Sequence, residues 1–337
     1  LSAYLVRANP EVDVWVARPG VGATELVEQM PEAWLNRVRG VEGVAWAVPL
    51  YRGSAVARGT DNNLYVIGLI GIDDSSLIGA PADMISGRVE DLKQPDTAIA
   101  DIATFKRLFG DLPITERPRI EIGKKQLEFV GVCRAVKTIT GGDVIYTRRS
   151  VAVRVGQEPN STVSFAMVKA APGADSTGVA RRIEKATGLV AYTRAEFTDN
   201  IVRWTIDNTG IVEVLGSVIV LGMVIGVLVV GQTFYLFAYE NQRYFAALKA
   251  MGTSDLTIVW TLCFPGLIVA VVGYALGLGG ATIILRLGDS DLSPMRGLTL
   301  EWPVAVGVAV LMPVLVLGTA LLGAMKVLRA EPGIVFR

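Results

Sequence analysis

The distribution of apolar and polar positions divides the chain into two unlike regions. Residues 1–208 mix charged and apolar side chains as a globular domain does, whereas residues 209–337 contain three long uncharged runs. These runs are Val214–Tyr239, Leu256–Leu285 and Trp302–Met325. Each is longer than the roughly 20 residues that a helix needs to cross a bilayer. The pattern therefore predicts three membrane spans, at about 211–239, 256–285 and 302–325.

Shorter patterns within the first 208 residues predict an α+β domain. Period-two alternation and β-branched residues predict strands at 12–17, 44–56, 64–72, 119–122, 127–132, 144–146, 163–168 and 189–192. Helical spacing predicts helices at 32–39, within 99–110, at 175–187 and at 193–208. The last of these begins with a capping box, Thr193 to Glu196, and we expect it to continue into the first span without a flexible linker.

Two strand–helix–strand units resemble each other weakly. Residues 37–44 (RVRGVEGV) and 182–189 (RIEKATGL) align at an offset of 145. A helix that ends in Gly before a strand is common, so chance similarity is the alternative to duplication. If the units are duplicated, residues 8–72 and 149–208 form lobe one, and residues 73–148 form an inserted lobe.

Composition narrows the possible functions. The chain is 51% hydrophobic, with a mean hydropathy of +0.46, and its formal net charge is zero, which gives no indication of a nucleic-acid partner. It has no histidine, so His-based catalysis and most zinc sites are excluded, and no G-x-x-x-x-G-K-[ST] nucleotide loop occurs. Cys133 lies in the polar region and Cys263 in an apolar run, so we expect no disulfide. We predict no catalytic residue, cofactor site or metal site.

The polar stretch 240–252 between the first two runs carries its own pattern. Its apolar positions recur at helical spacing and are Tyr244, Phe245, Leu248 and Met251. We therefore expect a small amphipathic helix at one membrane face. Gly252 suits the end of this helix, and Thr253 or Ser254 suits the cap of the next.

Two motifs connect the chain with a known family. Residues 243–252 (RYFAALKAMG) resemble the E-x-A-x-L-K-A-[LM]-G signature of FtsX/MacB-type permeases, the membrane subunits of a class of ABC transporters. The family usually has an acid near the position of Tyr244 or Phe245, and here the nearest acid is Glu240. The ending 330–337 (AEPGIVFR) is similar to the family's closing P-x-x-[IV]-[FL]-R. The two motifs together are most similar to the DevC-like branch.

The resemblance implies a fold and a mechanism. The implied fold is a two-lobe α+β extracytoplasmic domain, like the MacB periplasmic domain, plus an α-helical transmembrane bundle. The 240–252 helix would be a coupling helix that docks on a separate ATPase, which binds the ATP. Its expected residues are Glu240, Arg243, Tyr244, Phe245, Leu248, Lys249, Met251 and Gly252. Two copies would relay ATP-driven movement to the outer domain (mechanotransmission) and export a substrate with a membrane-fusion adaptor and an outer-membrane duct.

Other functions are compatible with the same residues. An FtsX-like regulator of a cell-wall hydrolase, a lipoprotein-releasing permease and a membrane-anchored receptor without an ATPase are the alternatives. From amphipathicity alone, the 240–252 helix could also lie flat on lipid. Family members carry a membrane helix before the large domain, and the start at Leu1 leads us to expect that such a segment is missing here.

Charge and glycine patterns bear on orientation and packing. Five basic residues flank the turn and the C-terminal end, against two in the loop at 286–301. The positive-inside rule then places the turn in the cytoplasm and the large domain outside the inner (cell) membrane. The pairs Gly222/Gly226 and Gly273/Gly277 allow close helix approach, within the chain or in a homodimer. Gln232, Tyr274 and the threonines of the spans are candidates for hydrogen bonds between helices.

Overall fold

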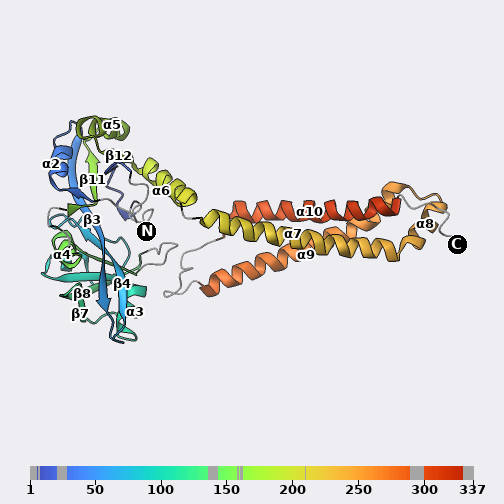
Figure 1. Cartoon of the computed structure of the whole chain (residues 1–337), viewed down its shortest axis with the longest axis horizontal. Coiled ribbons are helices and arrows are strands. Elements are labelled where there is room, and N and C mark those ends of the chain that lie inside the picture. The colour runs from blue at the N-terminus through green and yellow to red at the C-terminus, as the bar shows by residue number, and fades with distance from the viewer. Residues whose placement is uncertain are drawn as a thin grey trace. The chain divides into compact units, whose positions relative to one another are not determined.

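The computed structural model describes residues 6, 8–20, 29–135, 143–157, 159, 162–208, 210–288 and 300–328. The chain divides into two compact units, whose elements are labelled in Figure 1. The first unit comprises Leu1–Thr209 and Ser290–Gly297. The second comprises Gly210–Asp289 and Leu298–Arg337.

The first unit is built on one mixed β-sheet. Its strands are β1 (Val14–Ala17), β3 (Val44–Arg58), β4 (Leu64–Ile72), β5 (Met84–Ser86), β6 (Thr97–Asp101), β7 (Arg119–Ile122), β8 (Lys125–Cys133), β9 (Asp143–Arg148), β11 (Phe165–Ala170) and β12 (Val190–Thr193). Their order is β12-β1-β11-β3-β4-β9-β6-β8-β5, with β7 paired to β3 and β8. A separate pair consists of β2 (Met30–Pro31) and β10 (Thr162–Val163). The helices are α2 (Ala33–Arg39), α3 (Ile102–Phe109), α4 (Arg149–Val155), α5 (Ser176–Thr187) and α6 (Arg194–Asn208), with a 3₁₀ turn at Val89–Lys93.

Two strand–helix–strand units exchange strands symmetrically. The units are β1-α2-β3 and β11-α5-β12. Their first strands pair with each other, Val14 opposite Val168 and Val16 opposite Ala166, and each last strand pairs with the first strand of the other unit. Helices α2 and α5 cover one face, where the equivalent residues Val38 and Ile183 are both fully buried. This is the arrangement that a duplicated unit predicts, and it has the order of a split β-α-β fold.

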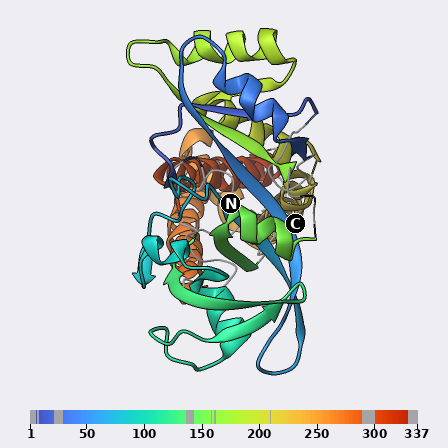
Figure 2. The same ribbon diagram turned by 90° about the vertical axis from the view of Figure 1, so that its left-hand side faces the viewer.

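The longest strand, β3, belongs to both halves of the sheet. Its residues 44–50 pair with β11, and its residues 51–58 pair with β4, which itself pairs in parallel with β9. Figure 2 shows β3 as the long blue strand that runs between the two parts of the first unit. A 15-residue strand reaches this far because a strand rises about 3.3 Å per residue.

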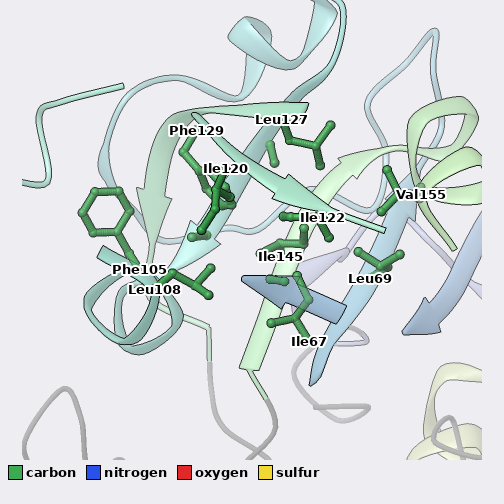
Figure 3. Packing of buried hydrophobic residues seen from close by; sticks show 14 of the residues in the cluster. Ile67, Leu69, Phe105, Leu108, Ile120, Ile122, Leu127, Phe129, Ile145 and Val155 are labelled. Carbon is green, nitrogen blue, oxygen red and sulfur yellow. The ribbon is translucent and has the colours of Figure 1, made fainter. Parts of the chain in front are cut away.

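The inserted part of the sheet has its own core. The core joins strands β4, β7, β8 and β9 to helices α3 and α4, and Figure 3 shows its side chains converging from these elements. Phe109 packs on Phe105 with 4.9 Å between ring centroids and on Phe129 with 5.2 Å. The short helix predicted within 99–110 is confirmed as α3, whereas the sequence prediction missed α4, β5 and β6. Strands β5 and β6 are short and acquire their conformation by pairing with β8 and β9, which local periodicity cannot show.

Helix α6 begins against the opposite face of the sheet. Phe197 stacks on Trp15 with centroids 5.2 Å apart and meets Phe165 edge-on at 5.6 Å. The capping box predicted at its start is present, because the Thr193 N–H donates to Glu196 Oε2 at 2.9 Å and the Glu196 N–H donates to Thr193 Oγ1 at 3.4 Å. These contacts hold the first turn of α6 on the sheet.

The prediction that α6 runs unbroken into the first span is wrong. Helix α6 ends at Asn208, and α7 (Ile211–Glu240) begins only after Gly210, whose φ of +63° is left-handed. A helix cannot continue through a left-handed residue, and glycine adopts this conformation without the penalty of a Cβ.

The second unit is helical. It consists of α7, α8 (Gln242–Ala250), α9 (Asp255–Gly288) and α10 (Trp302–Leu328). Three stretches are long and apolar enough to cross a membrane, namely Val212–Glu240, Leu256–Gly288 and Trp302–Leu321. Helix α10 packs on both α7 and α9, and the Tyr274 hydroxyl donates to the Ala305 carbonyl oxygen at 3.1 Å, as predicted for a bond between helices. The threonines instead bond within their own helices, as in the hydrogen bond from Thr261 to Thr257. The C-terminal motif 330–337 lies outside the described residues.

Candidate functional site

Helix α8 follows α7 after a single residue. That residue, Asn241, has φ −96° and ψ +11°, and both its N–H (3.1 Å) and its side-chain Nδ2 (2.9 Å) donate to the Phe237 carbonyl oxygen. The Phe245 N–H in turn donates to the Asn241 carbonyl oxygen at 3.1 Å. Asn241 therefore terminates one helix and starts the next, so that the chain changes direction with no loop between them.

The other end of α8 is a Schellman turn. Gly252 has φ +91°, the Thr253 N–H donates to the Leu248 carbonyl oxygen at 3.1 Å, and the Gly252 N–H donates to the Lys249 carbonyl oxygen at 3.0 Å. Ser254 then caps α9, since the Thr257 N–H donates to Ser254 Oγ at 3.4 Å. The helix stop predicted at Gly252 and the cap predicted at Thr253 or Ser254 are confirmed, the latter at Ser254.

One aromatic residue attaches α8 to the flanking helices. Phe245 is 3% exposed and packs with Ala238 of α7 and Ile258 of α9, while Leu248 and Val259 surround this cluster. Phe245 and Leu248 were both expected to contact the ATPase, whereas the structure buries Phe245 against α7 and α9, and Leu248 also packs against these helices. Neither Ala238 nor Ile258 was singled out from the sequence, because the residues next to them in the chain do not indicate that both pack against Phe245.

The opposite side of α8 is open. Tyr244 is 65% exposed and Met251 is 74% exposed, and Arg243 is exposed beside them. Tyr244 and Met251 are seven positions apart, about two helical turns, so they lie on one face. We call Arg243, Tyr244 and Met251 the outer face of α8. Glu240 is also exposed, at the end of α7, whereas Lys249 is partly buried.

The glycine pairs do not mediate close packing between the residues that the structure describes. An added Cβ would meet nothing within 4 Å at Gly222, Gly226, Gly273 or Gly277. The close approach is at Gly266 instead, where a Cβ would lie 3.1 Å from Phe234 Cζ and 3.5 Å from Val316 Cγ1. Gly222 and Gly226 line an apolar groove of about 310 Å³ between α7 and α10, which leaves them accessible to another molecule.

Possible metal ligands and free thiols complete the survey of the described part of the chain. No group of three or more His, Cys, Asp or Glu side chains in these residues could hold a metal ion. Cys133 and Cys263 are both buried and free. The outer face of α8 combines two apolar side chains with a guanidinium group, a composition suited to binding a protein surface.

Comparisons of the sequence with known proteins find similarity to permeases. The FtsX-like permease C-terminal family matches residues 216–332, which include α8. Two Mycobacterium tuberculosis proteins, each described as an uncharacterized ABC transporter permease, are 26% identical over 301 residues, covering 87% of this chain and 77% of theirs.

Among solved structures, the periplasmic region of MacB from Actinobacillus actinomycetemcomitans aligns with 60% of this chain and 96% of its own, at a TM-score of 0.43 and 14% identity. The extracellular domain of YknZ, a noncanonic ABC-type transporter from Gram-positive bacteria, covers 54% of this chain and 98% of its own, at a TM-score of 0.39 and 20% identity.

Proposed function

We propose that this chain is an ABC transporter permease of the FtsX/MacB type, and that its α8 docks on a separate ATPase subunit and relays the ATP-driven movement of that subunit to the first unit. The observation that carries the proposal is that one face of α8 packs against the flanking helices α7 and α9, while the other face is exposed. A helix that transmits force needs both properties.

Attachment comes from contacts at both ends and in the middle. Asn241 donates two hydrogen bonds to Phe237 of α7 and accepts one from Phe245 of α8, and Ser254 caps α9 directly after the turn at Gly252. Phe245 fills the space between the two long helices. A push on α8 therefore acts on α7 and α9 together, because a packed aromatic core deforms little.

Docking uses the outer face. Exposed aromatic and thioether side chains provide apolar contact area, and Tyr, Met and Arg are enriched at protein interfaces. A helix with Tyr244 and Met251 seven positions apart can lie in a groove of a partner, with Arg243 pairing an acid at its rim. Lipid contact would also cover these side chains, but lipid would not depend on a particular charge at Arg243.

The test is co-purification of the full chain with its ATPase in detergent. The variants Tyr244→Asp and Met251→Asp should lose the ATPase, because each places an unpaired carboxylate in the apolar contact, whereas membrane insertion should stay normal. The matched control is Val66→Asp, which alters a side chain that is 71% exposed in the first unit. Retention of the ATPase by both α8 variants at wild-type stoichiometry would refute docking on this face.

Further partners follow from the same proposal. We expect a homodimer whose α7 helices meet at the groove lined by Gly222 and Gly226. On the outer side, a membrane-fusion adaptor and an outer-membrane duct would receive the exported substrate. Native mass spectrometry should show a dimer that Gly226→Leu weakens and Gly273→Leu does not; equal dimer fractions in the two variants would exclude this interface.

A further inference from the structure

A polar groove in the first unit has no role in the mechanism proposed above. It has a volume of about 410 Å³, within the range of small-molecule sites, and lies between α5, β12 and α6, which pack together. These three elements can be followed in Figure 1. Its lining is Thr177, Ala180, Arg181, Glu184, Ala191, Tyr192, Glu196, Asp199, Asn200 and Arg203. The groove lies wholly within the first unit, so it is independent of docking at α8.

Three of the lining side chains are held in place by the protein. Glu184 Oε1 accepts the Ala191 N–H at 3.2 Å, and Glu196 Oε2 accepts the Thr193 hydroxyl at 2.7 Å. Tyr192 stacks on Phe197 with 6.0 Å between centroids. Burial and the nearby Glu184 carboxylate raise the pKa of Tyr192, so this hydroxyl stays protonated and can donate a hydrogen bond.

The remaining charged side chains lack such partners. Arg181, Asp199 and Arg203 form no ion pair or hydrogen bond with any residue that the structure describes, although opposite charges line the same groove. Arg181 is close enough to Glu196 to contribute to the lowering of that carboxyl's pKa, after the larger effects of the Thr193 N–H and hydroxyl, yet it makes no ion pair with it. By contrast, the neighbouring Arg182 donates from Nε to the Glu42 carbonyl oxygen at 2.9 Å.

We propose that this groove binds a short zwitterionic peptide, with the peptide carboxylate on Arg181 and Arg203 and its ammonium group on Asp199. Guanidinium groups are suited to carboxylates because they donate two parallel hydrogen bonds. A simple anion is disfavoured because Glu184, Glu196 and Asp199 would face it. Ala180 and Ala191 leave room for small side chains along the floor.

Binding would have a structural consequence. Arg181 belongs to α5, whereas Asp199 and Arg203 belong to α6, the last element of the first unit before α7 begins. A peptide held by both helices therefore ties α6 to α5. A ligand stabilises the state that it binds. A bound peptide would therefore make detachment of α6 from the sheet less frequent.

The test is isothermal titration calorimetry on the full chain in nanodiscs, with trialanine as the probe. N-acetyl-trialanine lacks the ammonium group, and trialanine amide lacks the carboxylate. Inorganic phosphate is an anion that has neither a peptide backbone nor an ammonium group. We expect trialanine to bind and each of the other three to bind at least tenfold more weakly. Arg181→Ala and Arg203→Ala should each weaken trialanine about tenfold or more, since a charged hydrogen bond is lost.

Two comparisons make the assignment specific. Asp199→Asn should weaken trialanine but leave N-acetyl-trialanine unchanged, because only the former carries the ammonium group. Lys185→Ala, which removes an exposed cation from α5 outside the groove, should leave trialanine affinity unchanged. Absence of trialanine binding, phosphate binding as tight as trialanine binding, or equal affinities for Arg181→Ala and Lys185→Ala would each overturn the proposal.

Discussion

Replacing Phe245 by alanine tests whether α8 is attached through this side chain. Phe245 is 3% exposed, and truncation of a buried Phe to Ala costs about 3–5 kcal/mol in protein cores. Its cluster is small, with Ala238 and Ile258 as the other buried members, so we take the lower limit of about 3 kcal/mol. Each 1.4 kcal/mol is a factor of about ten in an equilibrium, so local opening of α8 should become about a hundredfold more frequent.

Hydrogen–deuterium exchange on the full chain in nanodiscs measures that opening. The amides of residues 245–250 should exchange about a hundredfold faster in Phe245→Ala than in the wild type, because their protection reflects the local opening equilibrium. Tyr244→Ala is the matched control, since it also replaces an aromatic residue of α8 but one that is 65% exposed, and it should change protection by no more than about 0.5 kcal/mol. Equal protection in the two variants would show that Phe245 does not anchor α8.

Two further predictions concern α6 and the packing of the spans. The pKa of Glu196 lies below its ordinary value of 4.5 because the preceding cap residue donates its N–H and hydroxyl to the carboxylate, so the stabilisation is complete above pH 4.5 and is lost as the pH falls through the lowered pKa. Thermal unfolding midpoints should therefore be higher for the wild type than for Glu196→Gln at pH 7, and the difference should shrink towards zero below that pKa; a constant difference would contradict the assignment. Gly266→Leu should destabilise the helical unit by about 1–3 kcal/mol, because the new side chain enters the space of Phe234. Gly273→Leu should be nearly neutral in the same unfolding assay, and equal losses in both variants would contradict the placement of the close helix contact.

Part of the candidate site could be predicted because its signals are local. The end of α8 and the start of α9 depend on Gly252 and Ser254, whose backbone preferences act within one turn of the chain. The capping box at Thr193 is local for the same reason. The direction in which Phe245 points could not be predicted, because helical spacing groups it with Leu248 while the neighbours that bury it come from α7 and α9.

In the fold, too, the features that depend on local sequence could be predicted and those that depend on distant segments could not. Length and lack of charge alone determined the three apolar helices, since a 26-residue uncharged run has few alternatives. The break at Gly210 was missed because glycine is permitted in a helix as well as in a left-handed turn.

The sequence by itself determined where the apolar helices lie and where α8 ends, and it left open whether the two similar strand–helix–strand units are related. Only the tertiary structure decided that Phe245 points inward while Tyr244 and Met251 point outward, that Gly266 rather than the paired glycines is the point of close helix contact, and that α5 and α6 enclose a groove. The physical reason is that backbone propensities act over a few residues, whereas burial is a property of which distant segments come together.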